Sequence, residues 1–140
     1  MPGILLDTSV HLRRGKQPVA EALERLDPQR LRYRCAVVEL ELLRATDTRL
    51  YADVQTALRL ALLDLPMTEE VHTRAVKVQG LLVHTSQHAG VQIPDLLIAA
   101  CAEVHDITLI HYDADFDAIA AVTGQATEWI VPRGTADHED

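Results

Sequence analysis

Acidic residues follow or open apolar segments at three distant points of the sequence. Asp7 comes directly after the apolar residues 4–6, Asp113 follows the apolar residues 107–110, and Asp95 opens a segment that is apolar nearly throughout. Carboxylates that converge on one cleft repel one another, so they keep protons unless a cation lies among them. Oxygen ligands alone select a hard ion such as Mg²⁺ or Mn²⁺. The pattern therefore indicates metal-dependent cleavage of a phosphodiester bond.

Each of these acids also has a simpler interpretation as a helix cap. Asp is a favoured N-cap residue, and loops that lead from a strand into a helix often end in Asp, Ser or Thr. One Asp alone would not separate the two interpretations. Three such residues in one small fold favour a shared site.

Two glutamates, Glu39 and Glu41, lie in an otherwise apolar segment at residues 36–45. Residues two apart on a helix point to nearly opposite sides, so only one of the two can face a shared site. The helical pattern does not choose between them.

The elements that position these acids can be predicted from the hydrophobic pattern. Short, continuously apolar runs are typical of strands covered on both faces in a parallel sheet, and they occur at residues 4–6, 107–110 and 129–131. Amphipathic or apolar helical patterns alternate with them, at residues 18–26, 53–62, 68–82, 95–104 and 116–124. The predicted fold class is α/β, with a central parallel sheet flanked by helices. Ligands of such sheets bind at the carboxyl ends of the strands, where Asp7 and Asp113 would lie.

Four residues are expected to mark helix ends. Pro18 suits a first helical turn, Asp53 and Thr68 are candidate N-caps, and Gly124 is a candidate C-terminal cap. Cys35 and Cys101, which are far apart in the sequence, fit two reduced thiols in the core.

Length and composition indicate one globular domain. The chain has 140 residues, of which 48% are hydrophobic, and this excludes a disordered or fibrous protein. Its 21 acidic and 13 basic residues give a net charge of -8, which at first argues against a nucleic-acid partner. The charge is uneven, however, because residues 1–50 hold nine basic and seven acidic residues. No apolar run could span a bilayer and no signal peptide is evident, so we expect a cytoplasmic protein with no membrane partner.

Four segments, taken in order, resemble the PIN-domain ribonucleases and, within them, the VapC toxins of bacterial toxin–antitoxin pairs. They are Leu-Asp-Thr-Ser-Val at residues 6–10, Glu-Leu-Leu-Arg at 41–44, Ile-Pro-Asp-Leu-Leu-Ile-Ala-Ala at 93–100 and His-Tyr-Asp-Ala-Asp-Phe-Asp at 111–117. Each motif alone is weak, but their order and spacing together are specific. The resemblance implies a PIN-like nuclease domain at residues 1–134, followed by an acidic, disordered tail at residues 135–140.

The resemblance also implies the site residues. The catalytic cluster would be Asp7, Glu41, Asp95 and Asp113. The ligands of Mg²⁺ or Mn²⁺ would be Asp7, Asp95, Asp113 and Asp115. The alignment of Glu-Leu-Leu favours Glu41 over Glu39.

Two residues near Asp113 depart from the family pattern or fall outside it. Many members carry Thr or Ser at the position of His111, so the role of His111 stays open. Asp117 matches no ligand of the family and is read as an exposed residue of a first helical turn.

The implied activity is hydrolysis of RNA by a metal-activated water, which leaves 5′-phosphate and 3′-hydroxyl ends. The implied partners are RNA, an antitoxin that inserts a basic side chain into the acidic cleft, and a second copy in a homodimer. Arg13, Arg14 and Lys16 follow Asp7 and are candidates to contact the RNA backbone.

Two alternatives stay open: a DNA-acting or structure-specific nuclease with the same site, and a non-catalytic module whose acids bind basic peptides. For the ribonuclease and for both alternatives, the excess of acidic residues is accounted for by the site and the tail. Without the five site acids and three acids of the tail, acidic and basic residues would be equal in number.

Overall fold

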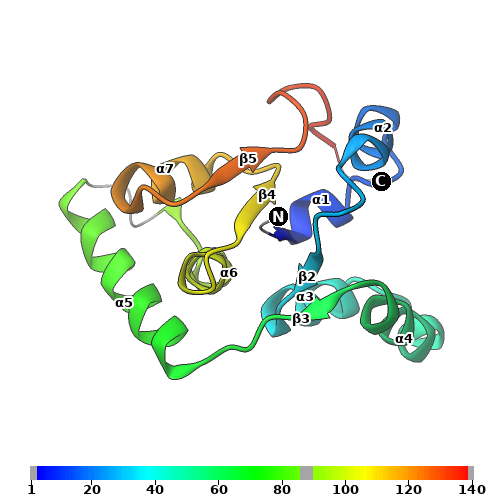
Figure 1. Ribbon diagram of the computed structural model, residues 1–140, viewed down its shortest axis with the longest axis horizontal. Helices are drawn as coiled ribbons and strands as arrows, with labels where there is room; N and C mark the ends of the chain where they lie inside the picture. Colours follow the sequence, from blue (N-terminus) through cyan, green and yellow to red (C-terminus); the bar gives the residue numbers. More distant parts are fainter. Residues whose placement is uncertain (1–2, 86–89, 139–140) are drawn as a thin grey trace.

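The computed structural model describes residues 3–85 and 90–138, and a five-stranded parallel sheet forms its centre (Figure 1). The strands are β1 (Ile4–Leu6), β2 (Arg32–Arg34), β3 (Leu63–Asp64), β4 (Thr108–His111) and β5 (Thr127–Trp129). Their order across the sheet is β3-β2-β1-β4-β5, and each neighbouring pair is parallel. The prediction of an α/β fold with a parallel sheet is confirmed.

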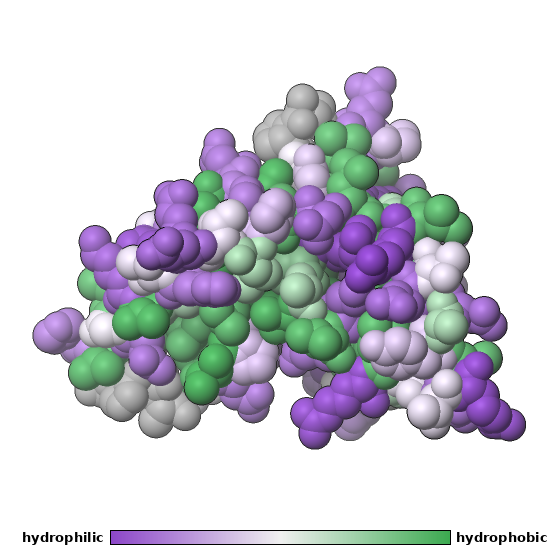
Figure 2. Space-filling model, turned by 90° about the horizontal axis from the view of Figure 1, so that it is seen from below, coloured by the Kyte–Doolittle hydropathy of each residue, from purple (hydrophilic) through white to green (hydrophobic). Residues whose placement is uncertain are grey.

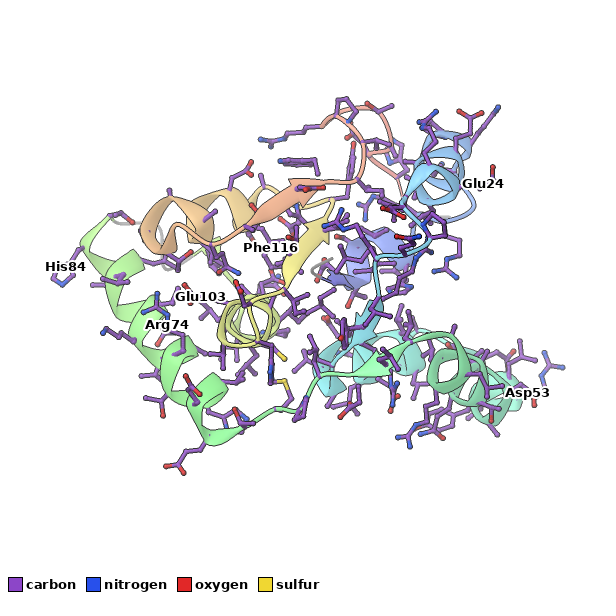
Figure 3. The ribbon with its side chains drawn as sticks, in the orientation of Figure 1. Glu24, Asp53, Arg74, His84, Glu103 and Phe116 are labelled. Carbon is purple, nitrogen blue, oxygen red and sulfur yellow. The ribbon has the colours of Figure 1, made fainter. Side chains whose placement is uncertain are left out.

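Helices flank this sheet. They are α1 (Thr8–His11), α2 (Gln17–Arg25), α3 (Ala36–Arg44), α4 (Tyr51–Ala61), α5 (Glu69–His84), α6 (Ile93–Val104) and α7 (Asp115–Thr123), with the 3₁₀ helix η1 (Thr48–Leu50) before α4. In Figure 1, α5 lies along one side of the molecule and packs on α6 and α7. Arg74 of α5 faces Glu103 of α6 (Figure 3), and their Nη2 and Oε2 atoms are 3.0 Å apart.

Two hydrophobic clusters cover the two faces of the sheet. Leu5 and Leu109 point into one cluster, together with α3, α5, α6 and α7, whereas their neighbours Ile4 and Ile110 point into the other. Successive strand residues face opposite sides of a sheet. Both faces of β1 and β4 are therefore buried, which explains why β1 is apolar throughout and why Leu109 and Ile110 form the centre of β4.

Most of the predicted helix ends are confirmed. Pro18 lies in the first turn of α2, Thr68 Oγ1 accepts a hydrogen bond from the backbone N–H of Val71 (3.3 Å), and Gly124 ends α7 with φ of 72°. A left-handed φ of this kind favours glycine. Asp53 is not a cap, because η1 continues directly into α4 and Asp53 lies inside the first turn of that helix.

The strand predictions missed β2 and β3 and misplaced β5. The sequence Arg-Tyr-Arg of β2 and the exposed Leu-Asp pair of β3 have no apolar run to indicate a strand. The last strand covers Thr127–Trp129 instead of residues 129–131, because Thr127 pairs with Leu109 of β4. Val131 is buried beyond the strand, in the second cluster.

The predicted disordered tail is wrong for its first residues. Ala136 is buried, and its backbone N–H donates to the hydroxyl of Tyr112 (2.9 Å). Its carbonyl accepts from Nε of Arg13 (2.8 Å). A Tyr and an Arg supplied by distant elements therefore hold this segment against the domain, whereas residues 139 and 140 lie outside the described part.

Other expectations concern the cysteines and the surface. Cys35 and Cys101 are buried and free, as predicted. Hydrophobic and hydrophilic residues are interleaved on the face shown in Figure 2, and Leu60, Val76 and Ile93 are each more than half exposed. No helix in residues 3–85 and 90–138 is long and apolar enough to cross a membrane.

Candidate active site

Asp7 lies at the carboxyl end of β1 and is almost completely buried, with 3% of its surface exposed. Its Oδ2 accepts hydrogen bonds from the backbone N–H (3.0 Å) and the hydroxyl (2.5 Å) of Ser9, so it caps α1. Its Oδ1 is buried and has no hydrogen-bond partner within the described residues. Burial, with a smaller contribution from the charge of Glu41, raises the pKa of Asp7 to about 6. One oxygen is thus a cap and the other is available to a ligand.

Ser9 joins two strand ends beneath this carboxylate. Its hydroxyl donates to Asp7 and accepts from the backbone N–H of Tyr112 (2.9 Å), which follows β4. Sequence reasoning did not single out Ser9. The available signal was a hydroxyl residue two positions after an Asp that ends a predicted strand.

Asp95 lies in the first turn of α6, next to the loop that follows β4. One carboxylate oxygen from each of Asp95, Asp113 and Asp115 lies within 4.8 Å of the other two. Burial raises the pKa of Asp95 to about 8, and so do the nearby charges of the other four acids: Asp7, Asp113, Asp115 and Glu41. All five predicted acids therefore share one electrostatic environment, although Asp7 and Glu41 lie outside the tight group of three.

The loop after β4 orients two of these acids. Asp113 Oδ1 accepts from the backbone N–H of Asp115 (2.9 Å). Burial raises the pKa of Asp115, and the charge of Asp113 adds to this effect. Asp117 is exposed and accepts from Trp129 Nε1 (3.1 Å), so it lies outside the cluster, as predicted.

His111 is fully buried at the end of β4. Its Nδ1 accepts from the backbone N–H of Asp113 (3.2 Å), and this bond assigns the proton of the neutral ring to Nε2. The ring packs against Phe116 and Trp129, with centroids 5.1 and 5.0 Å apart. Burial lowers its pKa, which favours the neutral form. His111 thus anchors the backbone of Asp113.

The two glutamates of α3 have different partners. Glu41 Oε1 accepts from the hydroxyl of Thr8 (2.8 Å), next to Asp7. Glu39 pairs with Arg34 (3.1 Å) and Arg59 (3.0 Å). Glu41 is therefore the glutamate that faces the acidic cluster.

The predicted RNA-contacting residues are already engaged in the folded chain. Nη1 of Arg13 donates to the carbonyl of Ser9 (2.9 Å), and its guanidinium lies 4.8 Å from the centre of the Tyr112 ring. Arg14 is exposed, and its Nη2 lies 3.0 Å from Nδ1 of His11. Lys16 is the N-cap residue of α2. Of these basic residues, Arg13 lines a pocket beside the acids.

The model of the PIN domain matches residues 4–122, which hold all five acids. This chain belongs to the PIN domain family. Ribonuclease VapC51 from Mycobacterium tuberculosis is 44% identical over 135 residues, which cover 95% of this chain and 96% of that relative. The sequence and the architecture therefore identify the same family.

Two solved structures share the fold of this PIN domain. VapBC-1 from nontypeable Haemophilus influenzae has a TM-score of 0.74 and 18% identity, and the match covers 91% of this chain and 97% of the other. VapBC-5 from Mycobacterium tuberculosis is a member of the VapBC family of toxin–antitoxin systems. It has a TM-score of 0.62 and 27% identity, and the match covers 94% of this chain and 100% of the other.

The donor set of this PIN domain fits a hard divalent cation. The group of three within 4.8 Å offers only carboxylate oxygens, which Mg²⁺ and Mn²⁺ prefer. The buried Oδ1 of Asp7 has no partner, and an unsatisfied buried oxygen is costly unless a ligand contacts it. Burial and, after it, the charges of the neighbouring acids raise the pKa of Asp95, and a bound cation would offset these charges.

Proposed function

We propose that this PIN domain is an endoribonuclease that requires Mg²⁺ or Mn²⁺ and hydrolyses phosphodiester bonds of RNA. The carboxylate cluster at the carboxyl edge of the sheet carries this proposal. Strongly raised carboxylate pKa values, such as that of Asp95, are typical of functional sites. The 44% identity to a ribonuclease over nearly the whole chain supports RNA as the substrate.

In this proposal the acids have distinct tasks. The ion would be held by Asp7, Asp95, Asp113 and Asp115. When bound, a divalent ion lowers the pKa of a water molecule and offsets the negative charge of the phosphate. Glu41 would orient the attacking water or complete the site, and the hydroxyl of Thr8 holds its carboxylate in position. Because water is the nucleophile, the RNA 2′-hydroxyl is not needed, and the products carry 5′-phosphate and 3′-hydroxyl ends.

Basic residues near the cluster would contact the RNA backbone. Arg14 and Lys16 lie shortly after Asp7 in the chain, and Arg13 lines the pocket beside Asp113. Contacts of this kind add affinity that depends on salt and not on sequence.

The variant Asp7→Asn tests the proposed activity. With Mg²⁺ or Mn²⁺ and a single-stranded RNA, we expect the cleavage rate to fall by at least about 100-fold. Mutation of a residue that only hydrogen-bonds to a metal ligand already lowers metal affinity or activity about 10- to 100-fold. The melting temperature should be retained. Asp53→Asn, on the exposed α4 (Figure 3), is the matched control and should cleave normally. Full activity of Asp7→Asn would overturn the assignment.

The substrate class is tested with RNA and DNA oligonucleotides of matched sequence. Cleavage of the RNA alone, with 3′-hydroxyl ends, is expected. Equal cleavage of the DNA would favour a DNA-acting or structure-specific nuclease. Binding of basic peptides that is insensitive to EDTA, without any cleavage, would favour a non-catalytic module.

We further propose that the chain is the toxin of a toxin–antitoxin pair and forms a homodimer. The similarity to VapBC-5 supports this assignment. A basic side chain of the antitoxin would enter the acidic cleft, where the charge is complementary.

Expression of this chain should arrest growth, and Asp7→Asn should relieve the arrest. A small protein encoded next to the gene should copurify with the chain and inhibit its cleavage of RNA. Light scattering should give twice the chain mass of 15.5 kDa; a mass of one chain would overturn the homodimer.

A further inference from the structure

A second feature of the site is a pocket of about 640 Å³ that adjoins the acids. Asp113 and Asp115 form part of its wall, and Trp129 and Arg133 form another part. Pockets that enclose small ligands measure roughly 300–1,000 Å³. The proposed function uses the two acids and Arg13, and it leaves Trp129 and Arg133 without a role.

Trp129 is half-buried and held firmly in the pocket wall. Its Nε1 donates to Oδ1 and Oδ2 of Asp117 (3.1 and 3.2 Å). The rings of Tyr112 and His111 pack against it, with centroids 5.3 and 5.0 Å away. An aromatic ring that is fixed before the ligand arrives loses little entropy on binding. Such rings are platforms on which the bases of single-stranded nucleic acids stack.

Arg133 supplies a positive charge beside this ring. It is exposed, and its guanidinium has no hydrogen-bond or ion-pair partner within residues 3–85 and 90–138. Its loop is anchored, because the backbone N–H of the next residue, Gly134, donates to the Tyr112 hydroxyl (2.8 Å). Arg13, by contrast, already donates to three backbone carbonyls. Of the two arginines that line this pocket, Arg133 is therefore the one whose guanidinium has no partner among the described residues.

We propose that this pocket binds a nucleotide of the RNA next to the bond that is cleaved, with its base stacked on Trp129 and its phosphate paired with Arg133. This inference rests on the proposed ribonuclease function and specifies how that site holds its substrate. A basic peptide is the competing occupant, since three acids also line the pocket. One of them, Asp137, already accepts from the Tyr112 hydroxyl (2.7 Å). The unpaired guanidinium and the fixed indole favour the nucleotide.

Trp129 is the single tryptophan of the chain, so its fluorescence reports directly on this pocket. The experiment titrates Asp7→Asn protein, in Mg²⁺ buffer, with a ten-residue single-stranded RNA that contains all four bases. We expect the fluorescence to be quenched on binding. Arg133→Gln should weaken the affinity about fivefold or more and lower the salt dependence by one phosphate contact. Lys77→Gln on α5, which removes the same charge from the lining of a different pocket, should leave the affinity unchanged.

A second variant removes the stacking surface itself. Trp129→Leu keeps an apolar side chain, and its binding is measured by the fluorescence anisotropy of labelled RNA after its melting temperature has been checked. A loss of about tenfold in affinity is expected from the loss of one stacked base. Unchanged affinity in both Trp129→Leu and Arg133→Gln would overturn the inference.

The outcomes separate this inference from the proposed function. Cleavage of RNA by the wild-type chain without quenching of Trp129 would overturn the subsite and leave the ribonuclease in place. Quenching without wild-type cleavage would support the pocket and overturn the ribonuclease. Quenching by an arginine-rich peptide but not by RNA would assign the pocket to a protein partner and overturn the subsite.

Discussion

At the scale of single residues, the two carboxylate oxygens of Asp7 differ in their hydrogen bonds. Oδ2 caps α1 through Ser9, while the buried Oδ1 has no partner in the described structure. The helix-cap interpretation therefore holds for Oδ2, and the proposed role as a metal ligand would use Oδ1 of the same carboxylate. Residue type and position can be read from a sequence, but the partner of each oxygen depends on the folded loop.

The raised pKa of Asp95 predicts how the metal-free protein responds to pH. An acid whose folded pKa of about 8 exceeds its usual 3.8 stays protonated in the fold, whereas the unfolded chain loses that proton near pH 4. Stability therefore falls as pH rises from about 4 to 8. In EDTA at pH 8, Asp95→Asn should melt higher than the wild type, by roughly 4 °C for each kcal/mol regained. The difference should vanish near pH 4.

Thermal melts across this pH range check the prediction, with Asp53→Asn as the variant that should follow the wild type. A lower melting temperature for Asp95→Asn than for the wild type at pH 8 would show that the carboxylate is not destabilising.

Ser9 is predicted to position Asp7. Ser9→Ala leaves the backbone N–H of Tyr112 without its acceptor, which should lower the free energy of unfolding by about 1–3 kcal/mol. It also removes a donor from Asp7 and should weaken Mn²⁺ binding measured by calorimetry. Ser9→Thr keeps the hydroxyl and should rescue the metal affinity. If Ser9→Ala bound Mn²⁺ like the wild type, Ser9 would be structural only.

At the scale of elements, the sequence predicts what apolar patterns can encode. Strands β1 and β4 were recognisable because both of their faces are buried. Strand β2 was not recognisable, because it contains polar residues whose partners lie outside the strand. Arg34, for example, donates to Glu39 and to the carbonyl of Leu62. Asp7 and Asp113 could be assigned to one sheet edge because each follows a predicted strand, whereas the choice of Glu41 over Glu39 depended on the family resemblance. The hydrogen bond of His111 and the packing of Ala136 could not, because each depends on elements that are distant in the chain.

The C-terminal segment is predicted to depend on one hydroxyl. Tyr112 Oη donates to Asp137 Oδ1 and accepts from the backbone N–H groups of Gly134 and Ala136. Tyr112→Phe removes all three bonds, so amide hydrogen exchange at residues 133–137 should accelerate about tenfold for each 1.4 kcal/mol lost. Exchange in α5 and α6 should change little. Tyr51→Phe, whose side chain is exposed, is the control, and equal exchange in the two variants would contradict this role.

At the scale of the whole molecule, the net charge of -8 depends strongly on acidic residues that are gathered in one place. Five of the 21 acids share one electrostatic environment, whereas nine of the 13 basic residues lie in the first fifty positions. An acidic total is therefore compatible with an RNA substrate, provided that a cation offsets the charge where the phosphate approaches. The distribution of charge, and not its sum, decides which ligands can bind.

This distribution predicts that divalent ions stabilise the fold. An ion that binds only the folded site at 100 times its dissociation constant adds about 2.7 kcal/mol, which corresponds to a rise of roughly 10 °C in melting temperature for a chain of this size. Scanning calorimetry with Mn²⁺ at pH 7.5 should show this rise. At pH 5.5 it should shrink, because Asp7 and Asp95, with pKa values of about 6 and 8, then hold protons that compete with the ion. Asp53→Asn should respond like the wild type, whereas Asp95→Asn combined with Asp113→Asn should not respond. An equal rise in that double variant would mean that Mn²⁺ binds elsewhere on this acidic protein, and the cluster would lose its role as the metal site.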